Sequence, residues 1–214
     1  METEPLKPEE FDAHIRAGTL RLALVGMANA GKSYRAKVLS DKADFLRYSV
    51  DDKIQNALAV DDLSAWMGYP SSGGYAEREK KYLELENTFT RKAAMQTDGK
   101  NLVFDTTGSV VHLLQDTLQV LSQNCLIVHL DVGDESLTEL ITKFFETPKP
   151  IAWDGFFEQK PGEGEIDALR RCYPILLRER LARYRALAHV AIRAHEIHDK
   201  SAPETLGMIR DKLT

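Results

Sequence analysis

One short segment of the chain combines glycines, a lysine and a serine at a spacing suited to holding a phosphate chain. Residues 26–33 read Gly-Met-Ala-Asn-Ala-Gly-Lys-Ser, which is the pattern G-x-x-x-x-G-K-S. In this pattern the glycines let the backbone wrap round phosphates, the lysine reaches the β- and γ-phosphates, and the serine hydroxyl is a Mg²⁺ ligand. An apolar run precedes the segment and a helix-compatible stretch follows it, as the motif requires. The alternative is a strand–helix turn that binds nothing.

We therefore predict a P-loop that binds ATP and Mg²⁺. Lys32 is predicted to act on the transferring phosphoryl group, and we expect its ammonium group to be solvated and unpaired when no nucleotide is bound. The predicted nucleotide-binding residues follow one another along the chain and are Gly26, Met27, Ala28, Asn29, Ala30, Gly31, Lys32, Ser33 and Tyr34.

An acidic residue ends a second apolar run. Asp105 directly follows residues 101–104, Asn-Leu-Val-Phe. After a P-loop, an apolar strand that ends in aspartate is typical of the carboxylate that holds Mg²⁺ directly or through water. Aspartate also caps helices, so a purely structural role is the alternative. We predict Ser33 and Asp105 as the metal-binding residues.

Two further carboxylates, Asp51 and Asp52, follow the run 45–50. In phosphotransferases a carboxylate at this place orients an attacking hydroxyl or accepts its proton. Both residues, together with Ser49, are also suited to capping the helix expected to begin there. We predict a substrate role for at least one of the two aspartates.

Strands and helices alternate along the chain. The expected strands cover residues 20–25, 45–50, 101–104, 125–130 and 189–193. The expected helices cover residues 33–40, 51–60, 75–97, 110–122, 135–145, 165–187 and 203–212, with Pro174 splitting the sixth into two. This order predicts a three-layer α/β/α fold with a parallel sheet, and ligands bind at the carboxyl ends of such strands.

Proline and glycine concentrate around residues 147–164, which also contain Trp153, Phe156 and Phe157. We predict a lid there; the alternative is a surface excursion whose aromatic side chains dock on the core. Residues 19–214 are expected to form one domain, and residues 1–18 an N-terminal extension that is either a capping helix or a loose tail.

The composition is that of a globular protein. Of the 214 residues, 43% are hydrophobic and 29% charged, with a formal net charge of −5 and two cysteines. The acidic balance disfavours a nucleic-acid-binding surface, no run is long and apolar enough to cross a membrane, and residues 1–10 do not read as a secretory signal. Two isolated cysteines suit a reducing compartment, so we expect a cytoplasmic protein.

The order of these motifs resembles the shikimate kinase family, within the nucleoside monophosphate kinase-like P-loop folds. The resemblance runs from about residue 20 to residue 212. It implies a five-stranded sheet of order 2-3-1-4-5, use of ATP and Mg²⁺, and a monomer. The blocks that carry it are residues 26–33, 49–55, 73–79, 105–110, 149–150 and 180–188.

The chain departs from the family pattern mainly where the family binds shikimate. Ala76 replaces an arginine that binds the substrate carboxylate, Thr106 and Thr107 stand in a triple-glycine turn, and Lys149 replaces the lid arginine. Ser49 stands where the family has a magnesium-associated aspartate. We infer that this carboxylate has moved to Asp105 on the neighbouring strand.

We therefore expect an ATP-dependent phosphotransferase that acts on a hydroxyl of a small metabolite other than shikimate. The alternatives are an ATP-binding regulatory protein or slow ATPase without a small-molecule acceptor, and a phosphotransferase acting on a protein or nucleic-acid hydroxyl. The predicted catalytic residues are Lys32, Asp51, Lys149 and Arg180. The predicted substrate-binding residues are Asp51, Arg78, Thr106, Thr107, Gly108 and Arg180.

Overall fold

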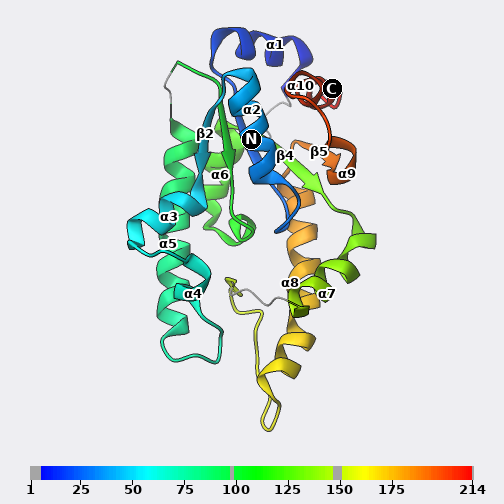
Figure 1. Ribbon diagram of the computed structural model, residues 1–214. Coiled ribbons are helices and arrows are strands. Elements are labelled where there is room, and N and C mark those ends of the chain that lie inside the picture. The colour runs from blue at the N-terminus through cyan, green and yellow to red at the C-terminus, as the bar shows by residue number, and fades with distance from the viewer. Residues whose placement is uncertain (1–5, 97–98, 147–150, 214) are drawn as a thin grey trace.

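The fold is built on one parallel sheet of five strands (Figure 1). In this computed structural model residues 6–96, 99–146 and 151–213 are described. The strands stand in the order β2-β3-β1-β4-β5, and all neighbours run parallel. Both the parallel sheet and the predicted strand order are confirmed. The strands are β1 (Arg21–Val25), β2 (Leu46–Ser49), β3 (Leu102–Asp105), β4 (Leu126–Asp131) and β5 (Val190–Arg193).

Two apolar cores lie on opposite faces of this sheet. In β1, Leu22 and Leu24 belong to one core, and Ala23 and Val25 to the other, because successive strand side chains point to opposite faces. The first core is covered by α1 (Pro8–Ala17), α2 (Lys32–Ala43), α9 (Ala194–Ile197) and α10 (Ala202–Arg210). The second is covered by α3 (Val50–Leu58), α4 (Leu63–Met67), α5 (Tyr75–Met95), α6 (Gln115–Asn124), α7 (Leu137–Glu146) and α8 (Glu165–Leu187).

The register of the strands brings three candidate segments to one edge of the sheet. Asp105 is the last residue of β3, and it pairs with Ser49 on β2 and with Leu24 on β1. The P-loop begins directly after β1, which ends at Val25. The end of β3 therefore lies between the P-loop and the start of α3, as the sequence predicts.

Pro174 does not split the long helix, so this prediction is wrong. Helix α8 runs unbroken from Glu165 to Leu187 with Pro174 inside it. A proline removes the hydrogen bond to the carbonyl four residues earlier. That residue, Arg170, is exposed, while Tyr173 and Leu176 on either side of the proline are buried in the core. Tertiary packing on both sides of Pro174 holds the helix together.

Other differences concern short elements. The predicted helix 110–122 is divided into a 3₁₀ turn, η1 (Val110–His112), and α6, and a second 3₁₀ turn, η2 (Asp134–Ser136), precedes α7. Helix α4 has five residues and was not predicted. Helix α1 lies within the predicted N-terminal extension and buries Phe11.

The aromatic segment 151–164, which belongs to the predicted lid, packs on the core. Residues 151–164 contain no helix or strand, and Trp153 is 2% exposed against Phe157 and Tyr173. Figure 1 shows this segment between the lower parts of α5 and α8. Lys149, the predicted lid cation, lies outside the described residues. Among the described helices, none is long and apolar enough to span a membrane.

Candidate functional site

The backbone between β1 and α2 forms a loop suited to an anion. Gly26 has φ 146° and a Cβ there would lie 2.8 Å from the carbonyl oxygen of Leu130, so only glycine fits. Gly31 has φ 89°, with no atom within 4 Å of the position of a Cβ, and no side chain caps α2. The N–H groups at the start of this 12-residue helix thus remain available to a phosphate.

Lys32 is buried, contrary to the expectation of a solvated ammonium group. The residue is 7% exposed, and its Nζ donates to the carbonyl oxygens of Gly26 (2.9 Å) and Met27 (3.0 Å). Desolvation lowers its pKa, while the charges of Asp105 and Asp51 oppose this shift. These two hydrogen bonds hold the lysine side chain against the P-loop, where it is expected to bind phosphate.

Asp105 and Ser33 lie together beside the loop. The Ser33 side chain lies close enough to the Asp105 carboxylate to act on its pKa, and Arg47 Nη2 lies 3.9 Å from Asp105 Oδ2. Desolvation raises the pKa of Asp105, and Ser33, Lys32 and Arg47 oppose that shift. A serine hydroxyl and one carboxylate, completed by phosphate and water oxygens, are a donor set that Mg²⁺ accepts. The residues fit the predicted metal site.

The segment after β5 lies beside α2. Arg35 is 1% exposed, and its guanidinium donates to the carbonyl oxygens of Ile197, His198 (2.8 Å) and Lys200 (2.5 Å) and to Thr205 Oγ1 (2.7 Å). The rings of Tyr34 and His198 are 5.7 Å apart. These contacts fix residues 195–202 next to the P-loop helix.

A cavity of about 460 Å³ adjoins the P-loop and contains several predicted site residues. Ala28 of the loop, Asp51 of α3 and Arg180 of α8 all line it, as does Gly108. Its volume falls in the range of small-molecule sites, about 300–1,000 Å³. The remaining lining residues are Gln55, Asp61, Asp62, Leu63, Ser64, Met67, Tyr82, Ser109, Ile151 and Ala152.

Asp51 is oriented by a tyrosine at the wall of the cavity. The Tyr82 hydroxyl donates to Asp51 Oδ1 at 3.3 Å. Desolvation raises the pKa of Asp51; Lys32 and the Tyr82 hydrogen bond oppose the shift, and Asp105 adds to it. The carboxylate thus lies within electrostatic reach of both the P-loop lysine and the predicted metal-binding carboxylate.

Arg180 presents a buried positive charge on another wall. The residue is 6% exposed; its Nε donates to His112 Nε2 (3.1 Å) and its Nη2 to the carbonyl oxygen of Ala152 (2.6 Å). Burial, together with the charges of Arg180 and Arg183, lowers the pKa of His112 to about 3. The neutral imidazole therefore accepts from Arg180 through Nε2 and donates through Nδ1 to Asp154 (3.0 Å).

Three predicted substrate-binding residues are engaged elsewhere. Arg78 donates to the carbonyl oxygens of Met67 and Gly73 and to Ser72 Oγ, so it fixes the loop before α5 and does not line the cavity. Thr106 and Thr107 are each 1% exposed. Their hydroxyls donate to the Leu24 carbonyl (2.8 Å) and to the Glu86 carboxylate, respectively. Both threonines are therefore buried beneath the cavity and do not line it.

Sequence reasoning missed a polar network beneath the cavity. Glu86 is fully buried and accepts from Thr107 Oγ1 and from Ser109 Oγ (2.7 Å), and Ser109 lines the cavity. Desolvation raises the pKa of Glu86 to about 7. Glu86 follows exposed Glu84 in the run Glu-Leu-Glu, and nothing in that run distinguishes the buried carboxyl. Tyr82 was also missed, because its hydrogen-bond partner, Asp51, lies on another helix.

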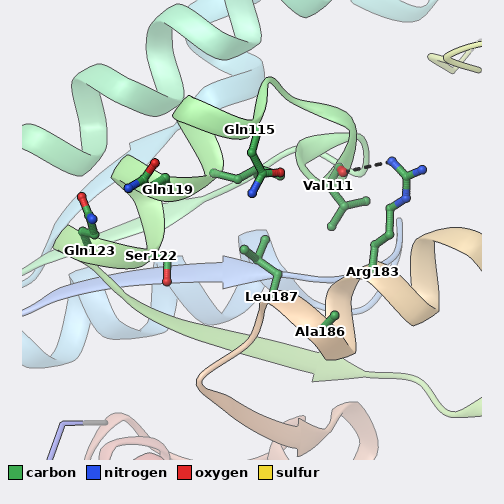
Figure 2. Close-up of a pocket in the computed structure, with 9 residues that line it drawn as sticks. Val111, Gln115, Gln119, Ser122, Gln123, Arg183, Ala186 and Leu187 are labelled. Atoms are coloured by element: carbon green, nitrogen blue, oxygen red, sulfur yellow. Dashed lines mark hydrogen bonds between the residues drawn. The ribbon is translucent and has the colours of Figure 1, made fainter. Parts of the chain in front are cut away.

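A second groove, of about 540 Å³, lies between α6 and the end of α8. Figure 2 shows Ser122 of α6 near Leu187 and Ala186 of α8, with Arg183 donating to the Val111 carbonyl oxygen. None of the predicted site residues lines this groove. The chemistry expected from the sequence thus belongs to the cavity beside the P-loop.

Comparisons with known proteins agree with this architecture. No protein-family model matches the chain. A shikimate kinase from Dehalococcoides mccartyi is 24% identical over 192 residues, which are 90% of this chain and 92% of that protein. The crystal structure of a shikimate kinase from Bacteroides thetaiotaomicron matches with a TM-score of 0.61 and 18% identity, covering 90% of this chain and 97% of that one. The shikimate kinase from Acinetobacter baumannii, solved in complex with shikimate, matches with a TM-score of 0.62 and 20% identity, covering 94% and 97%.

All three proteins align with most of the length of the chain, and the two solved structures resemble its fold, although few residues are identical. The similarity therefore bears on ancestry and fold, and the acceptor residues must be judged one at a time. The chain is a distant relative of the shikimate kinases and has the fold of the shikimate kinase-like P-loop kinases.

Proposed function

We propose that the protein transfers the γ-phosphoryl group of ATP to a hydroxyl of a small metabolite. The observation that carries this proposal is the cavity that Ala28 of the P-loop shares with Asp51 and Arg180. An acceptor bound there lies against the nucleotide loop, with a carboxylate to orient a hydroxyl and a cation to hold an anionic group. Phosphoryl transfer depends mostly on positioning and electrostatics, and this cavity supplies both.

Each group in the proposed site has one role. The P-loop N–H groups and Lys32 hold the phosphates, and Ser33 and Asp105 hold Mg²⁺, which when bound neutralises charge on the phosphates. Asp51 accepts a hydrogen bond from the acceptor hydroxyl and takes its proton as the bond from the acceptor oxygen to the γ-phosphorus forms. The bond between the γ-phosphorus and the β,γ-bridging oxygen breaks, and ADP leaves. The raised pKa of Asp51 makes the carboxylate a better proton acceptor at neutral pH.

Shikimate is not the acceptor that we propose. The related enzymes are named for shikimate, but this chain has Ala76 where the family pattern has a carboxylate-binding arginine. Arg78 does not replace it, because its guanidinium is bound to Met67, Gly73 and Ser72. Arg180 alone therefore provides the cation for an acceptor carboxylate among the described cavity-lining residues.

Two substitutions test whether Asp105 binds the metal and Asp51 binds the acceptor. Asp105→Asn is expected to weaken Mg²⁺-dependent ADP binding, measured by calorimetry with and without Mg²⁺, and to leave metal-free ADP binding nearly unchanged. Asp51→Asn is expected to keep the full Mg²⁺ effect and to lose ADP release stimulated by a panel of hydroxylated metabolites. Equal Mg²⁺ effects in Asp105→Asn and the wild type would show that Asp105 is only a structural cap.

A further inference from the structure

Charge is unevenly divided between the walls of the acceptor cavity. Arg180 is the cation among its described lining residues, whereas Asp51, Asp61 and Asp62 supply three carboxylates. The lining therefore carries more negative than positive charge. An acceptor whose only charge is a carboxylate would meet like charge over most of this surface.

The turn between α3 and α4 holds Asp61 and Asp62 in place. Asp62 is the N-cap of α4, and its Oδ1 accepts from the N–H groups of Ser64 (2.8 Å) and Ala65 (3.1 Å). Gln55 Nε2 donates to the Asp61 carbonyl oxygen at 2.8 Å. Neither Asp62 Oδ2 nor the Asp61 carboxylate makes a hydrogen bond within the described part of the chain. Because hydrogen bonds fix the backbone of the turn, Asp62 Oδ2 and the Asp61 carboxylate are held in place and can accept a hydrogen bond from a ligand.

None of these charges forms a direct ion pair in the described part of the chain, although Lys32 acts on Asp51 at longer range. Within residues 6–96, 99–146 and 151–213, no ion pair of 4.0 Å or less involves Asp51, Asp61, Asp62 or Arg180. Arg180 is more than nine-tenths buried, and its hydrogen-bond partners in the described ranges, His112 and the Ala152 carbonyl, are neutral; the Glu86 carboxyl lies within electrostatic reach but forms no ion pair with it. A buried guanidinium without a countercharge is costly, and an anionic ligand group lowers that cost.

We propose that the acceptor is a small zwitterion, a hydroxylated compound that carries both an anionic group and a protonated amine. Its anionic group pairs with Arg180, its ammonium group with Asp61 and Asp62, and its hydroxyl with Asp51. The volume of about 460 Å³ suits a compound of the size of a hydroxy amino acid. This inference rests on the proposed function, since it names the class of acceptor for the same cavity.

The test uses pairs of compounds that differ only in the amine. Homoserine is compared with 4-hydroxybutyrate, and serine with 3-hydroxypropionate, for binding to the full-length protein with Mg²⁺ and ADP, by calorimetry. We expect the amino acid of at least one pair to bind about tenfold tighter than its partner, the equivalent of about 1.4 kcal/mol. Phosphoryl transfer from ATP to the same compounds is assayed separately.

A double variant, Asp61→Asn with Asp62→Asn, is expected to abolish the preference for the amine. Asparagine is as good an N-cap as aspartate, so α4 is retained. Asp116→Asn, on exposed Asp116 outside the cavity, is the matched control and should leave the preference unchanged.

The results separate this inference from the proposed function. Amine-dependent binding without phosphoryl transfer would support the zwitterion and contradict the kinase proposal. Transfer to the hydroxy acids with no preference for the amine would support the kinase and overturn the zwitterion. The zwitterion is also overturned if none of the four compounds binds, or if the double variant keeps the preference.

Discussion

At the scale of single residues, Lys32 is held by the loop before any nucleotide is bound. Its ammonium group donates to two P-loop carbonyls, and burial lowers its pKa. A phosphate that enters the loop offers the same ammonium group a charged acceptor, and charge-assisted hydrogen bonds are stronger than bonds to carbonyls. The lysine is thus positioned near the place where the phosphates are expected.

Lys32→Ala is therefore expected to weaken Mg·ATP binding strongly. The loss of stability should be smaller, because removing the buried ammonium group also removes its desolvation cost, which offsets part of the two lost hydrogen bonds. Removing a buried charged partner costs about 2–5 kcal/mol of binding, roughly thirty-fold to several-thousand-fold in affinity. Calorimetry with ATP and thermal unfolding measure the two effects. Lys42→Ala, on the exposed surface of the same helix, is the control. Unchanged ATP affinity in Lys32→Ala would contradict the P-loop assignment.

Glu86 gives a prediction about pH. Its pKa in the folded protein is about 7, above the ordinary value of 4.5, so the folded state holds a proton that the unfolded chain has lost between these two values. Stability therefore falls as pH rises from about 4.5 to about 7, by about 3 kcal/mol for this group. Below pH 4.5 Glu86 is protonated in both the folded and the unfolded state, so it causes no loss of stability.

The variant Glu86→Gln removes this titration. Its free energy of unfolding relative to wild type is expected to rise by about 3 kcal/mol between pH 4.5 and pH 7.5, measured by urea denaturation. Glu84→Gln, at an exposed position on the same helix, should show no such change. A parallel pH dependence of stability in Glu86→Gln and wild type would show that Glu86 is ionised throughout this range.

Residue chemistry could be predicted from the sequence where it is local. The P-loop pattern is contiguous, and Asp51 and Asp105 each end a recognisable strand, so these side chains could be named in advance. Asp61, Asp62 and Ser109 line the cavity because of tertiary packing that no short pattern encodes. Arg78 was misplaced because its partners are the carbonyls and serine of its own preceding loop.

At the scale of elements, buried strands were easier to predict than short helices. The runs that became β1, β3 and β4 are nearly all apolar, as expected of strands covered on both faces. Helix α4 has only five residues, too few to show a periodic pattern of apolar residues. It is stabilised by its Asp62 cap and by the burial of Met67. The break predicted at Pro174 was wrong because tertiary packing keeps α8 intact, although proline by itself disfavours a helix interior.

Arg35 joins two elements far apart in the sequence. Its guanidinium ties α2 to residues 197–205, so Arg35→Ala removes four hydrogen bonds, of which those to Thr205 Oγ1 and the Ile197 carbonyl are buried. We expect a loss of about 3 kcal/mol or more in the free energy of unfolding. Residues 195–202 follow the last strand of the sheet and lie beside the P-loop helix, so we predict that they contact the adenine base. Weaker ATP binding by Arg35→Ala is therefore also expected. Lys37→Ala, on exposed Lys37 of α2, should have little effect on either quantity.

The adenine contact is checked by a structure of the protein with bound ADP. We expect atoms of residues 195–202 within about 4.5 Å of the base. If the base instead lies farther away, Arg35 is a purely structural tie. In that case Arg35→Ala should lose stability without a separate loss of ADP affinity at temperatures where it remains folded.

At the scale of the whole molecule, the proposed nucleotide half and the proposed acceptor half of the site differ in how far they could be predicted from the sequence. The P-loop, the sheet order and Asp105 could be predicted together, since parallel strands bring their carboxyl ends to one edge. The acceptor half depends on α3, α4, α8 and residues 151–152, which converge from separate parts of the chain.

Shikimate is accordingly expected to be a poor substrate or none. Loss of one arginine–carboxylate contact at Ala76 costs about 2–5 kcal/mol, or roughly thirty-fold to several-thousand-fold in affinity. Ala76→Arg is expected to raise shikimate use only slightly, because Asp51, Asp61 and Asp62 still line the cavity that would receive the shikimate carboxylate. The measurement is shikimate-dependent ADP release. Saturation of the unmodified protein at micromolar shikimate would contradict this view of the acceptor cavity.

The most direct test of phosphoryl transfer follows the γ-phosphate of ATP. The protein is incubated with ATP, Mg²⁺ and a mixture of small hydroxylated metabolites that includes zwitterions, and the products are followed by ³¹P NMR. We predict a new organic phosphate-ester signal that grows as ADP accumulates and that is absent with Lys32→Ala or Asp51→Asn. ADP accompanied only by inorganic phosphate, or no ATP consumption with any compound, would contradict the kinase and favour an ATP-binding protein or slow ATPase.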